Sequence, residues 1–138
     1  MSSLLDRPDF LGPHEEREIE LMASGAKPLA MFSEEWPTEE HLFDEEEFDA
    51  LVAQGCLVKQ VRIDAVVSHD GSEGQVRRIF YAQASEVWRI SAMLFVQDIY
   101  ESLGSGFRSD LERTIGLLLG YDRDHVEGYI AFLVEKTK

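Results

Sequence analysis

The chain has 138 residues, of which 44% are hydrophobic, and its 27 acidic and 13 basic side chains give a formal net charge of −14. This length predicts one domain that can bury a core without a disulfide or structural metal. No segment reaches the roughly 18 apolar residues of a membrane span, and the N-terminus lacks the pattern of a secretory signal. The single cysteine, Cys56, permits no internal disulfide. We therefore expect a cytoplasmic protein that does not bind membranes.

The charge is unevenly distributed. Residues 1–55 hold 15 Asp and Glu against 3 Lys and Arg, a balance of −12, whereas residues 56–138 hold 12 against 10, a balance of −2. An acidic surface repels nucleic acid and attracts basic partners in a salt-dependent way. Direct nucleic-acid binding is disfavoured, because no basic stripe is present to neutralise phosphates. The alternative interpretation is that the charge serves only solubility.

The N-terminal region predicts a flexible arm over residues 1–11, followed by a single α+β domain over residues 12–138. Gly12 and Pro13 favour the start of a helix, and Gly25 favours its end in a left-handed conformation. Residues 28–32 are typical of a short strand. Pro28 at its start favours an edge position in a sheet or the beginning of a strand, because proline cannot donate a ladder hydrogen bond.

Residues 33–47 carry eight carboxylates and no Lys or Arg, the most unusual composition in the chain. Part of this segment has a structural explanation. Asp44 and Glu47 have the spacing of a capping box, and Phe43 and Phe48 have that of a hydrophobic staple. The sequence therefore predicts a helix from Glu45 to about residue 54, ended by a glycine.

Residues 56–82 predict an antiparallel hairpin. Apolar and polar residues alternate from Cys56 to residue 68, turn-forming residues follow, and a second strand returns over residues 75–82. Within the hairpin we expect Asp64 to pair with Arg62, Arg77 or Arg78. With the strand at residues 28–32, this gives a sheet of about three strands.

The segment 83–103 predicts the central helix of the fold. Its apolar side chains recur every three or four residues, which is the helical period, and further apolar residues flank them. We expect other elements to surround this helix. One face of this predicted helix consists of Trp88, Ala92, Phe95, Ile99 and Leu103.

Two further helices are expected after residue 104. Ser109 and Glu112 suggest a capping box for the first, which should stop at Gly120, and Asp122 or Asp124 should cap the second. The expected fold is thus α+β: a small antiparallel sheet packed on the helix at 83–103, with additional N- and C-terminal helices.

No catalytic or cofactor motif stands out, and we expect neither a cofactor nor a metal. The chain has no glycine-rich phosphate loop and no zinc-ligand spacing among its four histidines. The carboxylates at 39–47 could hold a hard cation, but the glycine-punctuated loop of calcium sites is missing. His69 and Asp70 fit turn chemistry better than a catalytic pair, and Cys56 is predicted to be a buried small hydrophobe.

The leading functional hypothesis is a non-catalytic, acidic protein-interaction module that binds a basic protein surface, as an inhibitor, immunity-type or regulatory protein. Interface energy concentrates on aromatic side chains ringed by polar groups. Trp36 is therefore the expected anchor within the array Glu34, Glu35, Glu39, Glu40, Glu45 and Glu46.

The alternative hypothesis is a small-molecule-binding protein or enzyme with a pocket between the sheet and the central helix. Tyr81, Trp88, Arg89 or Arg78 would line that pocket. Homodimerisation, through the hairpin edge or the apolar central helix, is compatible with both hypotheses.

Overall fold

The computed structural model describes residues 17–40, 43–104 and 106–136. Its centre is a three-stranded antiparallel sheet of strand order β1-β3-β2, formed by β1 (Leu29–Trp36), β2 (Leu57–Val67) and β3 (Glu73–Gln83). The α+β class, the hairpin and the edge position of the strand after Pro28 are confirmed. The expected arm at 1–11 and the expected helix start at Pro13 lie outside the described residues.

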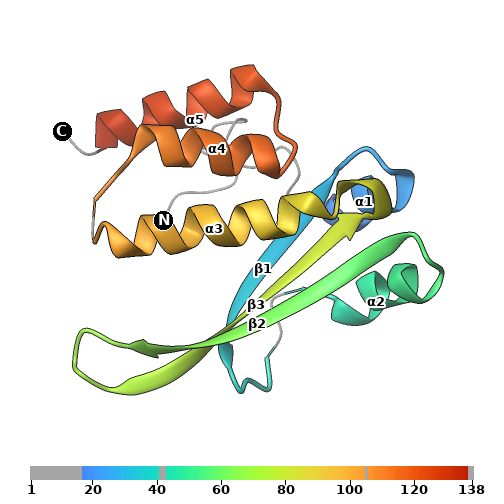
Figure 1. Ribbon diagram of the computed structural model, residues 1–138, viewed down its shortest axis with the longest axis horizontal. Coiled ribbons are helices and arrows are strands. Elements are labelled where there is room, and N and C mark those ends of the chain that lie inside the picture. Colours follow the sequence, from blue (N-terminus) through green and yellow to red (C-terminus); the bar gives the residue numbers. More distant parts are fainter. Residues whose placement is uncertain (1–16, 41–42, 105, 137–138) are drawn as a thin grey trace.

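Helices cover both faces of the sheet (Figure 1). One face, called here the α2 face, packs against α1 (Glu18–Ser24) and α2 (Glu45–Ala53). The opposite face, called the α3 face, packs against α3 (Trp88–Ser102) and α4 (Ser109–Leu118), and α5 (Arg123–Lys136) packs on α4. The end of the β2–β3 hairpin extends beyond the helices (Figure 1).

The core of the α2 face is rich in aromatic residues. The rings of Phe32 and Phe43 stack with centroids 4.1 Å apart, and those of Phe48 and Tyr81 stack at 4.9 Å. The predicted start of α2 is confirmed, because Asp44 Oδ1 accepts a hydrogen bond of 3.2 Å from the backbone N–H of Glu47. The cap fixes where α2 begins, and the two ring stacks hold the α2 segment against the sheet.

The core of the α3 face joins the sheet to α3 and α4 through buried aliphatic side chains and Phe80. Two contacts attach the end of α4 to the segment before β1. The buried Lys27 ammonium donates to the carbonyl oxygen of Leu119 at 2.9 Å. Gly120 has a φ of 87°, and a Cβ there would lie 2.4 Å from Cδ of Pro28, so only glycine fits this approach.

Strand β1 is longer than expected. The sequence predicted a strand over residues 28–32, but pairing with β3 continues to Trp36, which lies opposite Gln75. Glu34, Glu35 and Trp36 are therefore strand residues with alternating orientations. The hydrogen-bond ladder with the long strand β3 outweighs the low strand propensity of this acidic segment.

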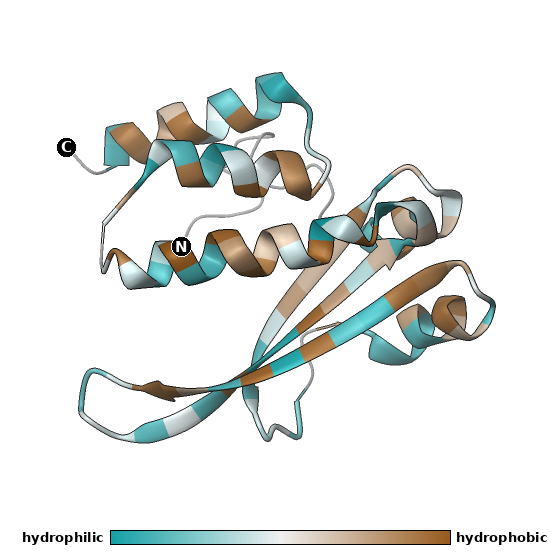
Figure 2. Cartoon of the chain, viewed as in Figure 1, coloured by the Kyte–Doolittle hydropathy of each residue, from teal (hydrophilic) through white to brown (hydrophobic). Residues whose placement is uncertain are grey.

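The expectation that the helix at 83–103 is surrounded is wrong. A 3-10 turn (Ala84–Glu86) precedes α3, and only Ile90, Met93 and Val96 of α3 are buried. Trp88 is 57% exposed, Phe95 67% and the adjoining Leu103 52%. The reason is topological: α1 and α2 pack on the opposite face of the sheet. Hydrophobic residues nevertheless run along the whole of α3 (Figure 2).

The caps of the last two helices match the prediction in part. Ser109 is the first residue of α4, not its cap, and the expected capping box is absent. Glu112 instead accepts a hydrogen bond of 2.9 Å from the hydroxyl of Tyr100. At α5, Asp122 is the cap, accepting from the backbone N–H of His125 at 2.9 Å.

Within the described residues, no helix combines the length and the apolar character that crossing a membrane would require. Cys56 is exposed, contrary to the expectation of a buried side chain. It lies in the turn between α2 and β2, after Gly55, and Leu57 is the first residue that points inward.

Candidate functional site

Three of the seven predicted partner-binding residues have partners within the chain. Glu34 is buried, and its Oε1 accepts a hydrogen bond of 3.0 Å from Arg77. Glu45 accepts from Arg77 at 2.6 Å and from Lys59 at 2.7 Å. The guanidinium of Arg77 lies over the ring of Trp36, 4.9 Å from its centroid. These residues stabilise the α2 face.

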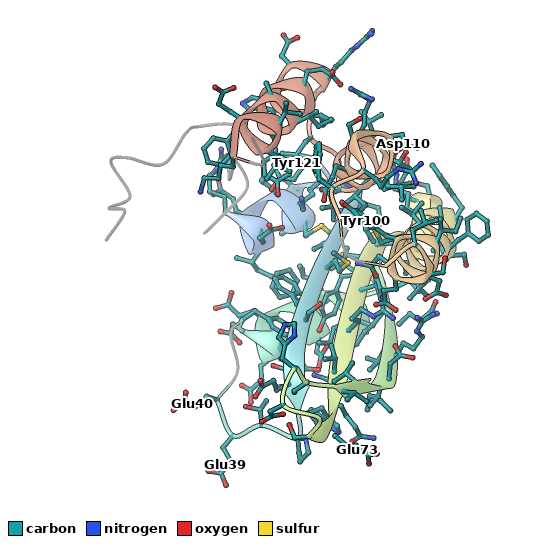
Figure 3. All side chains as sticks on the ribbon, turned by 90° about the vertical axis from the view of Figure 1, so that its left-hand side faces the viewer. Glu39, Glu40, Glu73, Tyr100, Asp110 and Tyr121 are labelled. Carbon is teal, nitrogen blue, oxygen red and sulfur yellow. The ribbon has the colours of Figure 1, made fainter. Side chains whose placement is uncertain are left out.

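The remaining predicted residues are exposed and lie where β1 ends and α2 begins. Of the eight carboxylates in residues 33–47, only those of Glu34 and Glu45 are not on exposed residues. Figure 3 places Glu39, Glu40 and Glu73 at one end of the molecule, away from Tyr121 and Asp110. We call this region the acidic end; its exposed acids in 33–47 are Glu35, Glu39, Glu40, Asp44, Glu46 and Glu47.

An open hollow lies at the acidic end. It has a volume of about 470 Å³, and three of its six lining residues carry carboxylates. The hydroxyl of Thr38 accepts from the backbone N–H of Glu40 at 3.1 Å and donates to its carbonyl oxygen at 3.0 Å, which holds the loop on one side. The lining residues are Ser33, Glu34, Glu35, Thr38, Glu40 and Val76.

A second hollow of about 530 Å³ adjoins the first and shares Ser33 and Val76 with it. It lies between the α3 face of the hairpin and the C-terminal half of α3. We call it the groove; its other lining residues include Arg62, Asp64, Arg78, Gln97, Asp98 and Tyr100.

Arg62 and Arg78 of the hairpin reach across the groove to α3. Arg78 donates to Asp64 at 2.8 Å and to Gln97 at 2.6 Å, and Arg62 donates to Asp64 at 2.9 Å and to Asp98 at 2.5 Å. The hydrogen bond from Arg78, followed by that from Arg62, lowers the pKa of Asp64. The predicted pairing of Asp64 is thus confirmed for Arg62 and Arg78. Arg77 points to the opposite face.

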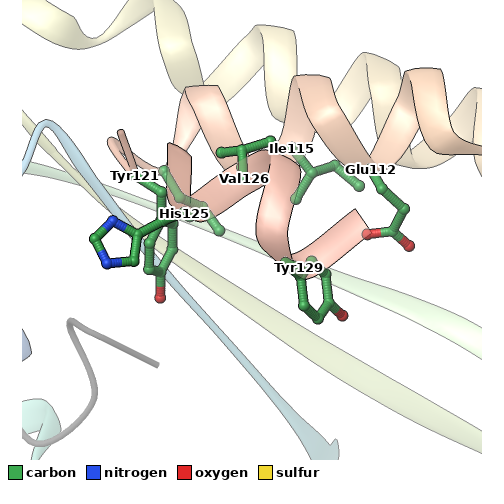
Figure 4. A pocket seen from close by; sticks show the side chains of 8 residues that line it. Glu112, Ile115, Tyr121, His125, Val126 and Tyr129 are labelled. Atoms are coloured by element: carbon green, nitrogen blue, oxygen red, sulfur yellow. The ribbon is translucent and has the colours of Figure 1, made fainter. Parts of the chain in front are cut away.

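A smaller cavity of about 210 Å³ lies between α4 and α5 (Figure 4). Tyr121, His125 and Tyr129 line it together with Glu112. His125 Nδ1 lies 2.6 Å from Asp122 Oδ2, an imidazole–carboxylate pair that sequence reasoning missed. The Asp-x-x-His spacing at the start of a helix could have revealed it. The pair is exposed, and the cavity is below the roughly 300 Å³ at which ligand sites begin.

The other candidate side chains do not converge. Asp70 accepts from Ser72, not from His69. Tyr81 lies on the α2 face, where its hydroxyl donates to Asp49 at 2.8 Å, whereas Arg78 lies on the α3 face. Tyr81, Trp88, Arg89 and Arg78 therefore do not line one pocket. In the ranges that the structure describes, no three His, Cys, Asp or Glu side chains are grouped as metal ligands would be.

The fold and these hollows define a small acidic α+β protein with an open, carboxylate-lined surface at one end of its sheet. No known family model matches the chain, and neither a curated protein nor a solved structure shows significant similarity to it.

Proposed function

We propose that this chain is a non-catalytic interaction module whose acidic end binds a basic protein surface, as inhibitor, immunity-type or regulatory proteins do. The observation that carries this proposal is the open hollow at which the carboxylates of Glu35 and Glu40 are exposed, beside Glu34, which is buried and paired with Arg77. Further exposed carboxylates of the acidic end are those of Glu39, Glu46 and Glu47.

A lysine or arginine side chain of the partner is the group that this hollow suits best. Carboxylate oxygens accept charge-assisted hydrogen bonds, and arginine can donate two in parallel to one carboxylate. The exposed acids around the hollow would speed the approach of a basic surface more than they would strengthen the final complex. Binding should therefore weaken with salt, because exposed charges are screened beyond about 10 Å at 0.1 M.

The test uses a fluorescent nona-arginine peptide as the probe and measures binding by anisotropy at low and at physiological salt. We expect the double variant Glu35→Gln/Glu40→Gln to bind at least several-fold more weakly than the wild type. The matched control, Asp124→Asn/Glu135→Gln, removes two charges from α5 and should retain most of the affinity.

Two results would contradict the proposal. One is binding that does not change with ionic strength. The other is equal weakening in both double variants, which would mean that the probe senses only the overall charge of −14.

The groove supports a second candidate function, the binding of a small molecule between sheet and helix. Its volume of about 530 Å³ lies within the range of ligand sites, and Arg78 is buried beside it. An anionic ligand would compete with Asp64 and Asp98 for Arg62. A rise in Tm with small carboxylates or phosphates that is lost in Arg62→Gln would favour this candidate, and no rise in the wild type would reject it.

A further inference from the structure

We infer that the basic partner binds as an extended segment that adds a strand to the sheet, antiparallel to β1 and along the edge that does not pair with β3. The inference rests on the function proposed above and names the form of the partner. The open edge, as we call this site, consists of the backbone N–H and C=O groups that Ser33 and Glu35 direct away from β3.

The strand order and the hydrogen-bond pattern define the open edge. In the order β1-β3-β2, no strand of the described residues pairs with the outer side of β1. The backbone N–H of Gln83 donates to the carbonyl oxygen of Pro28 at 3.1 Å, and hydrogen-bonded pairs then recur at every second residue of an antiparallel ladder. The residues whose backbone groups point away from β3 are therefore Leu29, Met31, Ser33 and Glu35.

Exposure restricts the open edge to the end of β1. Leu29 is 0% exposed and Met31 packs against the core of the α3 face, whereas Ser33 and Glu35 are exposed. Backbone N–H and C=O groups must form hydrogen bonds, and a row of them at a sheet edge is a template for another strand. The added strand should be short, because it can pair only along Ser33 and Glu35.

The charge beside the open edge indicates which strand would fit. Directly paired residues in neighbouring strands have side chains on the same face, with Cβ atoms about 4.5–5.5 Å apart, and opposite charges stabilise such a pair. The side chains of Ser33 and Glu35 both line the acidic hollow. A residue paired with Glu35 would thus face its carboxylate, with Glu40 on the same hollow as a second acceptor. We therefore expect Lys or Arg opposite Glu35.

The other edge of the sheet, along β2, does not suit a basic segment. The single carboxylate of this strand is that of Asp64, and it already pairs with Arg62 and Arg78. Val61 and Ile63 are 39% and 43% exposed there, so the exposed side chains along this edge are largely apolar. Charge complementarity therefore favours β1 over β2.

The first test uses a peptide in which arginine and threonine alternate, so that every arginine lies on one face of an extended strand. In an antiparallel pair, the residues directly opposite Ser33 and Glu35 are those whose N–H groups point at β1. N-methylation of the arginines should therefore weaken binding at least several-fold. N-methylation of the threonines, which keeps the same charge, should not. Fluorescence anisotropy measures all three peptides.

The outcomes of this test separate the strand addition from the proposed function. Equal binding of the two methylated peptides would overturn the strand addition, while salt-dependent binding of nona-arginine would still support the acidic end as the site. Failure of both the alternating peptide and nona-arginine to bind would reject both proposals. A greater loss from methylated threonines would mean that the added strand is parallel, which would overturn the proposed direction.

The second test measures amide hydrogen exchange in the chain with and without the alternating peptide. Exchange at Ser33 and Glu35 should slow at least several-fold, because their N–H groups become hydrogen-bonded. Ile63 is the matched control: Ser68 N–H donates to the carbonyl oxygen of Ser72 at 2.8 Å, and the same alternation directs the N–H of Ile63 outward from β2. Slowing at Ile63 in place of Ser33 and Glu35 would overturn the inference.

A pair of variants tests the same contact without changing any charge. Ser33→Pro removes an outward N–H and leaves the ladder with β3 intact, and proline is tolerated at such edge positions. This variant should bind the alternating peptide several-fold more weakly than the wild type. Ile63→Pro makes the equivalent change on β2 and should bind it as the wild type does. Unchanged binding by Ser33→Pro would contradict strand addition at the open edge.

Discussion

Two neighbouring arginines in β3 show how the two faces of the sheet differ. Arg77 and Arg78 point to opposite faces, and both are buried, at 8% and 6% exposed. Arg77 lies beneath α2, between the carboxylates of Glu34 and Glu45. Arg78 lies at the edge of the groove, where one of its acceptors is the neutral amide of Gln97.

The difference shows which face is closed and which is open. On the α2 face, charged groups complete a packed aromatic core, so substitutions there should act mainly on stability. On the α3 face, the ion pairs border the open groove, and Trp88, Phe95 and Leu103 in and beside α3 are more than half exposed. We therefore expect contacts with partners to be made mainly from the α3 face and the acidic end that adjoins it.

The largest effect should come from Arg77→Leu. This change leaves the Glu34 side chain, which is 2% exposed, without the guanidinium that offsets its desolvation. Breaking one partner of a buried ion pair costs about 3–5 kcal/mol. Equilibrium unfolding in urea at neutral pH should show a loss of this size. Arg77→Lys should recover only part of it, because an ammonium cannot reproduce the fork that reaches Glu34 and Glu45.

Arg78→Leu is the matched comparison and should cost less, about 1–2 kcal/mol. Asp64 is 39% exposed and keeps its hydrogen bond to Arg62, and Gln97 keeps its contact with the sulfur of Met31. Equal losses in Arg77→Leu and Arg78→Leu would mean that the two faces do not differ as described.

The parts of the fold that were predicted from sequence are those with local signals. The hairpin follows from alternation and turn residues within one stretch of chain, and α2 follows from Asp44 and Phe43, which lie next to it. Asp122 at the start of α5 is a signal of the same kind.

The predictions that were wrong concern contacts between residues that are far apart in the sequence. Glu34 and Arg77 are 43 positions apart in the sequence. No local pattern therefore shows that Glu34, a member of the acidic array, is paired with an arginine of the same chain. The hydrophobic period of residues 83–103 correctly predicts a helix. Whether the side of α3 that carries Trp88 and Phe95 is covered depends on which face of the sheet α1 and α2 occupy, and hydrophobic periodicity carries no such information.

A smaller effect is expected from Glu45, whose contribution to the unfolding free energy should depend on pH. Hydrogen bonds from Arg77 first, and also from Lys59, lower the pKa of Glu45 to about 2. A carboxyl whose pKa is lower in the folded state stabilises the fold above its ordinary pKa near 4.5, and this contribution is lost as the pH falls toward 2. Because the pair is partly open to solvent, we expect about 1–2 kcal/mol at neutral pH.

The measurement compares urea unfolding of the wild type and Glu45→Gln between neutral pH and about pH 3. The difference in unfolding free energy should be largest at neutral pH and should shrink as the medium becomes acidic. Glu46→Gln is the matched control, one residue further along α2 and exposed, and it should differ little from the wild type at any pH. A constant difference for Glu45→Gln would mean that its ion pairs do not contribute in this way.

The smallest effect is expected at Cys56, on the rim of the α2 face. Its side chain is exposed, so Cys56→Ser should change the unfolding free energy by less than about 0.5 kcal/mol. A thiol reagent should also modify Cys56 in the folded protein without waiting for unfolding. Ala30→Ser adds a hydroxyl at a position with 0% exposure on the same face and should cost about 1–3 kcal/mol. A slow thiol reaction limited by unfolding would show that the closed face extends over Cys56.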